Sequence, residues 1–179
     1  MLPYSFPEKV EPKLAVVRAY WESLKRAGNE MPFWDDVKPS SLPDLAGSLL
    51  LFDVFERPER YRFSFIGRDL LDWYGKQISN DFADGVELRN PFEYLISQCS
   101  ATVEGCVPSY YRHVATGMPK NRTSKSFARI LLPLGRGPHP DAAGRDCRIR
   151  DAEVWPDARA ARRGAAKLTS TKHLFGSIS

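Results

Sequence analysis

The sequence lacks a run of about 18 apolar residues, the length that a membrane-spanning helix needs. Its first residues, MLPYSFPEKVEPK, show no basic start followed by an apolar core, so we expect no secretory signal. Cysteine is scarce: Cys99, Cys106 and Cys147 have no disulfide-framework spacing and suit a reducing compartment. We therefore expect a cytoplasmic protein with no membrane partner.

Motifs that carry chemistry are also scarce. The sequence has no phosphate-cradling glycine loop of the Walker or dinucleotide type. Cys99, Cys106 and His113 are evenly spaced, but no fourth ligand with the spacing of a closed zinc site accompanies them. A Cys–His nucleophile would need an orienting partner for His113, and the sequence shows none. We therefore expect no catalytic residue, no metal and no cofactor.

The net charge of +4 is confined to the C-terminal part of the chain. Residues 1–135 carry 17 basic and 17 acidic groups, whereas residues 136–179 carry 9 basic and 5 acidic groups. The second stretch is rich in Arg, Ala, Asp, Pro and Gly, with no alternating apolar run of four residues. It is either a native tail or the product of a shifted reading frame, whose translation it resembles. Trp155 and Phe175 are its only Trp, Tyr or Phe residues. A basic surface that binds nucleic acid needs more aromatic side chains between its basic ones. We expect a basic, disordered tail over 136–179 and no nucleic-acid partner.

The stretch 48–67, SLLLFDVFERPERYRFSFIG, predicts an antiparallel hairpin on which the rest of the chain packs. Tyr61, Phe63 and Phe65 alternate with polar residues, the period of a half-buried strand. The preceding run is apolar except for Asp53, and the charged segment around Pro58 fits the connection between the strands. The hairpin is expected to present an aromatic inner face that other strands and helices must cover.

The N-terminal region, 1–30, predicts an amphipathic helix over residues 12–27. Leu14, Val17, Trp21 and Leu24 recur at steps of three and four residues and form one apolar stripe. The stripe follows heptad spacing for barely more than two heptads. It either packs on its own domain or forms a homodimer, and both alternatives stay open.

The remaining elements predict an α+β fold. A short helix follows Gly67 and closes at Gly75, and Asn90-Pro91 gives a helix start with a cap, ending at Gly105. Residues 108–116 and 126–134 are rich in aromatic and β-branched side chains and predict strands, with Pro133 restricting the second to an edge or marking its end. Strands in two adjacent pairs favour an antiparallel sheet with helices on one face.

Short patches along residues 14–135 resemble a PAS domain. They are LAVVRAYWESL, Met31-Pro32, SLLLFDVF, RYRFSFIG, WYGKQI and ARILLPLG, in this order. The chain is most similar to the short bacterial PAS-like proteins of the fifth PAS-type sequence family, whose function is largely undefined. The resemblance implies a PAS-like domain over 31–135 with a five-stranded sheet. The family pattern continues into an apolar fifth strand after Gly135, and this sequence shows no such run, so the C-terminal strand is expected to be missing.

The resemblance also implies a function. PAS-like modules act in signalling as sensors or interaction modules, and we expect a cavity for a small apolar ligand between sheet and helices. The Asn-Cys-Arg-Phe motif of flavin-binding members is absent, and no histidine lies in 91–104, so flavin and haem are not expected. The alternative is a small α+β enzyme with a pocket under the sheet. The residues expected to line the pocket are Phe52, Phe63, Phe65, Trp73, Tyr74, Leu95, Ile96, Cys99 and Leu131.

Overall fold

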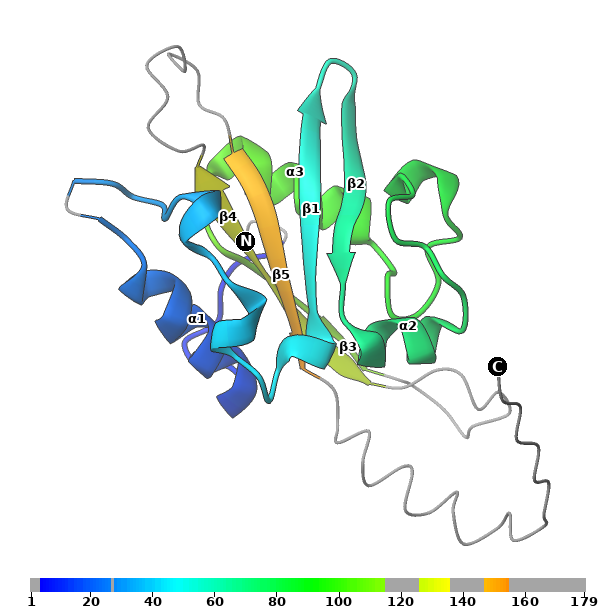
Figure 1. Cartoon of the computed structure of the whole chain (residues 1–179), viewed down its shortest axis with the longest axis horizontal. Coiled ribbons are helices and arrows are strands. Elements are labelled where there is room, and N and C mark those ends of the chain that lie inside the picture. The colour runs from blue at the N-terminus through cyan, green and yellow to red at the C-terminus, as the bar shows by residue number, and fades with distance from the viewer. Residues whose placement is uncertain (1–3, 27, 115–125, 136–146, 155–179) are drawn as a thin grey trace, which may run out of the picture.

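A computed structural model describes residues 4–26, 28–114, 126–135 and 147–154. An antiparallel sheet with the strand order β2–β1–β5–β4–β3 forms the centre, and helices lie against both of its faces (Figure 1). The helices and strands are α1 (Pro12–Ser23), β1 (Leu49–Glu56), β2 (Glu59–Ile66), α2 (Arg68–Tyr74), α3 (Leu95–Gly105), β3 (Ser109–His113), β4 (Phe127–Gly135) and β5 (Cys147–Val154). Short 3₁₀ helices lie at Trp34–Asp36, Pro39–Ser41, Ala46–Ser48 and Ala83–Gly85. The predicted α+β class is confirmed, whereas the prediction of helices on one face is wrong, because the apolar stripe of α1 packs on the face opposite α2 and α3.

The β1–β2 hairpin contains a bulge that sends neighbouring aromatic residues to opposite faces. Leu51 pairs with Phe65 and Phe52 pairs with Phe63, so Ser64 is an extra residue on β2. The Ser64 hydroxyl donates a hydrogen bond to the Leu51 carbonyl over 3.0 Å. Phe63 is fully buried on the face covered by α2 and α3, whereas Phe65 is half-buried on the other face. The prediction that both rings share one face is wrong, because the bulge breaks the two-residue period.

Helix α1 packs on the sheet through the predicted stripe. Leu14, Val17 and Trp21 are at most 4% exposed and belong to one apolar cluster with Ile130 and Leu132 of β4. This chain's own sheet therefore covers these three residues, in agreement with the first of the two alternatives. The helix ends at Ser23, four residues before the predicted end, so Leu24 lies just beyond it and is half-buried outside the cluster.

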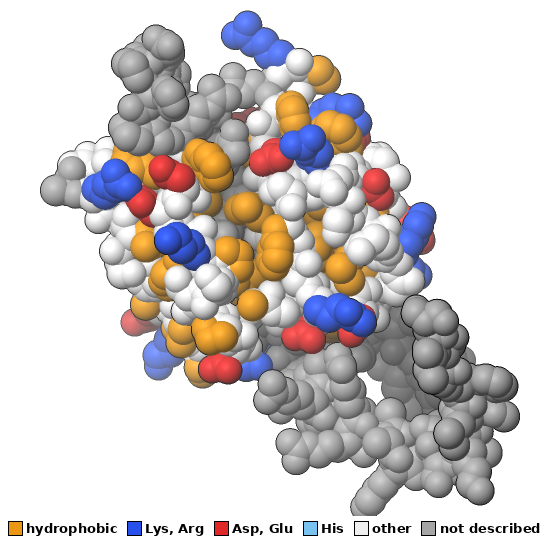
Figure 2. All heavy atoms as spheres, viewed as in Figure 1, with side chains coloured by type: hydrophobic (Ala, Val, Ile, Leu, Met, Phe, Trp, Pro, Cys, Tyr) orange, Lys and Arg blue, Asp and Glu red, His pale blue; other side chains and the backbone are white. Residues whose placement is uncertain are grey.

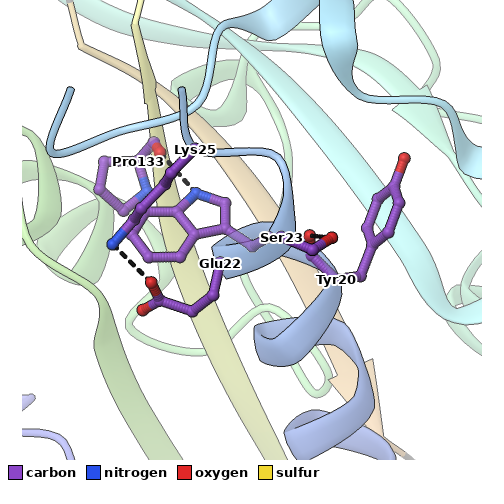
Figure 3. Close-up of polar contacts among 6 residues, drawn as sticks. Tyr20, Glu22, Ser23, Lys25 and Pro133 are labelled. Carbon is purple, nitrogen blue, oxygen red and sulfur yellow. Dashed lines mark hydrogen bonds and ion pairs between the residues drawn. The ribbon is translucent and has the colours of Figure 1, made fainter. Parts of the chain in front are cut away.

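One buried hydrogen bond fastens α1 to β4. The Trp21 indole N–H donates to the Pro133 carbonyl over 2.8 Å. Figure 3 shows Pro133 on its strand beside the end of the helix, where Lys25 reaches back to Glu22. The Lys25 ammonium lies 2.7 Å from the Glu22 carboxylate and 4.0 Å from the centre of the Trp21 ring. The C-terminal turn of α1 is thus held by polar as well as apolar contacts.

Helices α2 and α3 cover the opposite face. Helix α2 ends as predicted at Gly75, whose φ of 78° is a left-handed conformation that glycine adopts without strain. Helix α3 begins at Leu95, four residues after the predicted start. The segment before it is not helical, because Tyr94 has a φ of 56° and the Pro91 carbonyl accepts a hydrogen bond from Arg129 of β4. The predicted Asn90 cap is therefore wrong.

Strand β5 fills the centre of the sheet, where no strand was expected. It pairs with β1 on one side and with β4 on the other. The prediction that the whole of 136–179 lies outside the packed domain is therefore wrong for 147–154, whereas 136–146 and 155–179 lie outside the described residues. Backbone pairing with two neighbours overrides a composition that does not favour a strand.

Because β5 lies beside it, β4 is an interior strand, so the first of the two alternatives for Pro133, an edge strand, is wrong, and the strand continues two residues beyond this proline. Pro133 lies within β4 and pairs with Ile149 of β5, whereas the pairing of β4 with β3 ends at Leu131. The missing N–H of the proline therefore falls beyond the end of β3, where the sheet tolerates it.

Candidate functional site

The face of the sheet under α2 and α3 carries a cluster of buried aromatic side chains, which we call the aromatic cluster: Phe52, Tyr61, Phe63, Tyr74 and Phe92. Each is at most 4% exposed. The ring centres of Phe52 and Phe63 lie 4.8 Å apart, and Phe92 lies 5.5 Å from Phe63 and 5.4 Å from Tyr74. These tilted arrangements are favourable for aromatic pairs. The cluster joins β1, β2, α2 and the segment before α3 into one apolar interior.

Eight of the nine predicted pocket residues converge around this cluster, and Phe65 does not. The residues that are buried in it are Phe52, Phe63, Tyr74, Leu95, Cys99 and Leu131. Trp73 and Ile96 are partly buried and pack against its edge. The structure therefore places these residues together as a packed interior between sheet and helices, and the β2 bulge removes Phe65 from it.

A buried polar network lies at the β3–β4 side of the aromatic cluster. Arg129 is fully buried, and its Nε donates to Oε1 of Gln98 over 2.8 Å. Its two other nitrogens donate to the carbonyls of Pro91 and Glu93 over 3.2 and 3.1 Å. Hydrogen bonds to a charged donor stabilise by about 1.5–3 kcal/mol each. Arg129 therefore fixes the bent segment that leads into α3.

Gln98 extends this network from β4 through α3 to β3. Its Nε2 donates to the Ser109 hydroxyl over 3.1 Å, and its backbone carbonyl accepts from Thr102 over 2.8 Å. The Thr102 and Ser109 hydroxyls are 2.6 Å apart. All four side chains, from Arg129 to Ser109, are at most 4% exposed. A satisfied buried network of this kind fixes one relative position of helix and sheet.

A second polar group links β2 to α3 on the other side of the aromatic cluster. The Tyr61 hydroxyl donates to the Glu59 carboxylate over 2.6 Å, and the Ser100 hydroxyl donates to the same oxygen over 2.5 Å. Burial raises the pKa of the Tyr61 phenol far above its usual value, and the hydrogen bond to Glu59 raises this pKa further. Tyr61 therefore stays protonated and acts as a hydrogen-bond donor at the edge of the aromatic cluster.

His113 has an orienting partner that the sequence did not reveal. Its Nδ1 lies 2.9 Å from Oε2 of Glu93, and its ring stacks on Phe127 with ring centres 5.4 Å apart. The Arg129 guanidinium lies 5.2 Å from the centre of the Tyr111 ring. Burial raises the pKa of Tyr111, and the nearby Glu93 carboxylate adds to this effect. The contact between His113 and Glu93 holds β3 against the segment that leads into α3.

The cysteines and carboxylates do not form a metal site in the described part of the chain. No group of three His, Cys, Asp or Glu side chains among these residues is placed to hold an ion. Cys99 is buried in the aromatic cluster, and the Cys106 thiol donates to the Val103 carbonyl. Both thiols therefore lie in packed or hydrogen-bonded surroundings, on and just beyond the apolar face of α3.

A shallow depression of about 420 Å³ lies on the outer side of α2. Arg68, Asp72 and Lys76 line it together with Leu71, Gly75 and Gln77. Arg68 is already paired with Asp72, with 3.0 Å between Nε and Oδ1. The depression is open and lies outside the aromatic cluster, so the two features are separate.

Comparisons with protein-family models, with curated proteins and with solved structures found no match. None of the described helices has the length and apolar character that crossing a membrane requires.

Proposed function

We propose that the chain is a PAS-like sensory or interaction module that binds a small apolar ligand within the aromatic cluster. The observation that carries the proposal is the convergence of eight predicted pocket residues between the sheet and the α2–α3 side. The antiparallel sheet of β1 to β5 supports it, since the resemblance implies five strands. An apolar interior with a few convergent polar groups is the usual setting for small-molecule recognition.

The segment that covers the aromatic cluster between α2 and α3 offers a route for a ligand. Its regular structure over residues 76–94 is limited to the 3₁₀ helix Ala83–Gly85. Polar contacts hold it in place: the Tyr74 hydroxyl donates to the Glu87 carbonyl over 3.1 Å, and Arg89 donates to the Tyr74 carbonyl over 2.9 Å. Backbone hydrogen bonds also join the segment to Phe63 of β2, but it contains no α-helix or strand, and such a segment opens at lower free energy than a helix or strand does.

The buried polar network gives ligand binding a way to affect the rest of the fold. Leu95 and Cys99 of α3 belong to the aromatic cluster, and Gln98 of the same helix binds Arg129 of β4. A ligand that displaces α3 would therefore strain the Gln98–Arg129 contact, because packed interiors transmit small shifts. Strand β4 would carry the effect to its other face, where α1 packs.

Native mass spectrometry of the full chain, followed by titration with the neutral fluorescent probe N-phenyl-1-naphthylamine, tests the proposal. We expect saturable probe binding, strengthened by Phe92→Leu because the shorter side chain leaves space in the aromatic cluster. Phe55→Leu is the matched control, since Phe55 is 40% exposed and lies outside the cluster. The absence of both a bound mass and saturable probe binding would contradict the proposal, as would an equal effect of the two substitutions.

A further inference from the structure

Strand β5, at the centre of the sheet, is paired unequally with its two neighbours. Strand β5 pairs with β4 from Ala128 to Gly135, but with β1 only from Leu49 to Leu51. Figure 1 shows β1 and β5 close together at the start of β1 and apart toward its end. The strand is thus paired on both sides over a short stretch, residues 150–152.

The neighbours of this stretch are apolar on both faces of the sheet. The position of Asp151 lies between Leu50 and Leu131, both fully buried in the cluster under α2 and α3. The position of Arg150 lies between Leu51 and Leu132, which belong to the cluster under α1. Cross-strand pairs stabilise a sheet when their side chains match, and leucine neighbours favour apolar residues. The register therefore favours apolar residues at two positions where the sequence has charged ones.

Two positions beyond Asp151, the register favours an acidic residue. Glu153 pairs in register with Arg129, the fully buried arginine of the polar network. Opposite charges at directly paired positions are favourable. The pattern that suits this part of the sheet is therefore two or three consecutive apolar residues followed by an acidic one.

Figure 2 shows apolar side chains gathered along the middle of the face that carries α1, between that helix and the β1–β2 hairpin, with charged side chains at the margin. The partly buried apolar residues of this face include Leu42, Leu51 and Phe65. Apolar neighbours therefore flank the central position on the outer face as well as on the face under α2 and α3.

We propose that a partner protein donates an extended strand of this pattern, which replaces β5 between β1 and β4. The incoming strand runs antiparallel to both neighbours, as β5 does, and its backbone takes over the same hydrogen bonds. Strand donation to an existing sheet obtains affinity from main-chain hydrogen bonds and specificity from alternate side chains. This proposal deepens the interaction role given above and names the chemistry of the partner.

Fluorescein-labelled peptides spanning residues 148–154 test the exchange on the full chain by fluorescence anisotropy. One peptide carries Arg150→Val and Asp151→Leu, a second has the unaltered sequence, and a third contains the residues of the first in scrambled order. We expect the substituted peptide to bind at least about tenfold more tightly than either control. Equal affinity of the three peptides would overturn the proposal.

The same two substitutions placed in the chain give an independent measurement. The Arg150→Val/Asp151→Leu chain should melt several degrees higher than the parent and should bind the substituted peptide more weakly, because its own β5 now competes. A melting temperature at or below that of the parent would overturn the proposal. The effect of Phe92→Leu on N-phenyl-1-naphthylamine binding reports on the aromatic cluster, whereas the peptides report on the β5 position, so a failure of strand exchange and a failure of ligand binding are distinguishable.

Discussion

Replacing Trp21 by phenylalanine should destabilise the protein by more than the change in ring size alone would. The substitution removes the hydrogen bond to the Pro133 carbonyl and leaves a buried acceptor without its donor, which costs about 1–3 kcal/mol. The smaller ring also leaves space in a site where Trp21 is only 4% exposed. We expect Trp21→Phe to lower the free energy of unfolding by about 2–4 kcal/mol.

Lys25→Met is the matched control, because it removes the cation beside the same ring and keeps the hydrogen bond. Lys25 and its ion-pair partner Glu22 are partly exposed, so this change should cost no more than about 1 kcal/mol. Urea unfolding followed by far-ultraviolet circular dichroism measures both variants without relying on indole fluorescence. A loss below about 0.5 kcal/mol for Trp21→Phe, or equal losses for the two variants, would refute the packing of α1 on β4.

Three further substitutions, one of them with a matched control, test other parts of the fold. Gly67→Ala would place a Cβ 2.3 Å from the Gly47 carbonyl oxygen and should cost at least about 2 kcal/mol in urea unfolding; Gly85→Ala, with nothing within 4 Å, should stay within about 0.5 kcal/mol. Arg129→Met should cost about 3–5 kcal/mol, seen as a large drop in melting temperature, and an unchanged melting temperature would show that the polar network contributes nothing. The raised pKa of Tyr61 keeps it protonated in the folded state while the unfolded chain titrates near 10.0, so its contribution is full below that pH and is lost above it. Unfolding free energies measured on either side of pH 10 should therefore fall less steeply for Tyr61→Phe than for the parent, and equal slopes would contradict the burial of the phenol.

The spacing of apolar residues and the positions of glycine and proline were sufficient to predict most of the local structure. The stripe from Leu14 to Trp21 predicted α1, and the glycine after α2 predicted its end. The two strands of the hairpin follow from alternation and from the charged connection between them. These features depend on residues close in sequence, which is why one-dimensional patterns reveal them.

Features that depend on contacts between distant residues could not be predicted. The bulge at Ser64 depends on pairing with Leu51, and the late start of α3 depends on Arg129, more than thirty residues further along the chain. The sequence did offer one signal for the polar network, a single charged residue inside the apolar stretch 127–134. Strand β5 left no signal at all, because its position follows from the pairing of β1 and β4 and not from its own composition.

The strand order also determines when the sheet can be completed during synthesis. Strands β1 and β2 pair with each other, as do β3 and β4, so each half of the sheet can form soon after it leaves the ribosome. Among the described strands, β5 between the two halves is made last, and its pairing with β1 closes a loop of nearly one hundred residues, from Leu51 to Arg150. Such non-local pairing is slow to form. From the completion of β4 until β5 emerges, the nascent chain therefore holds two pairs of strands with unpaired inner edges, and in this interval those edges are open to aggregation.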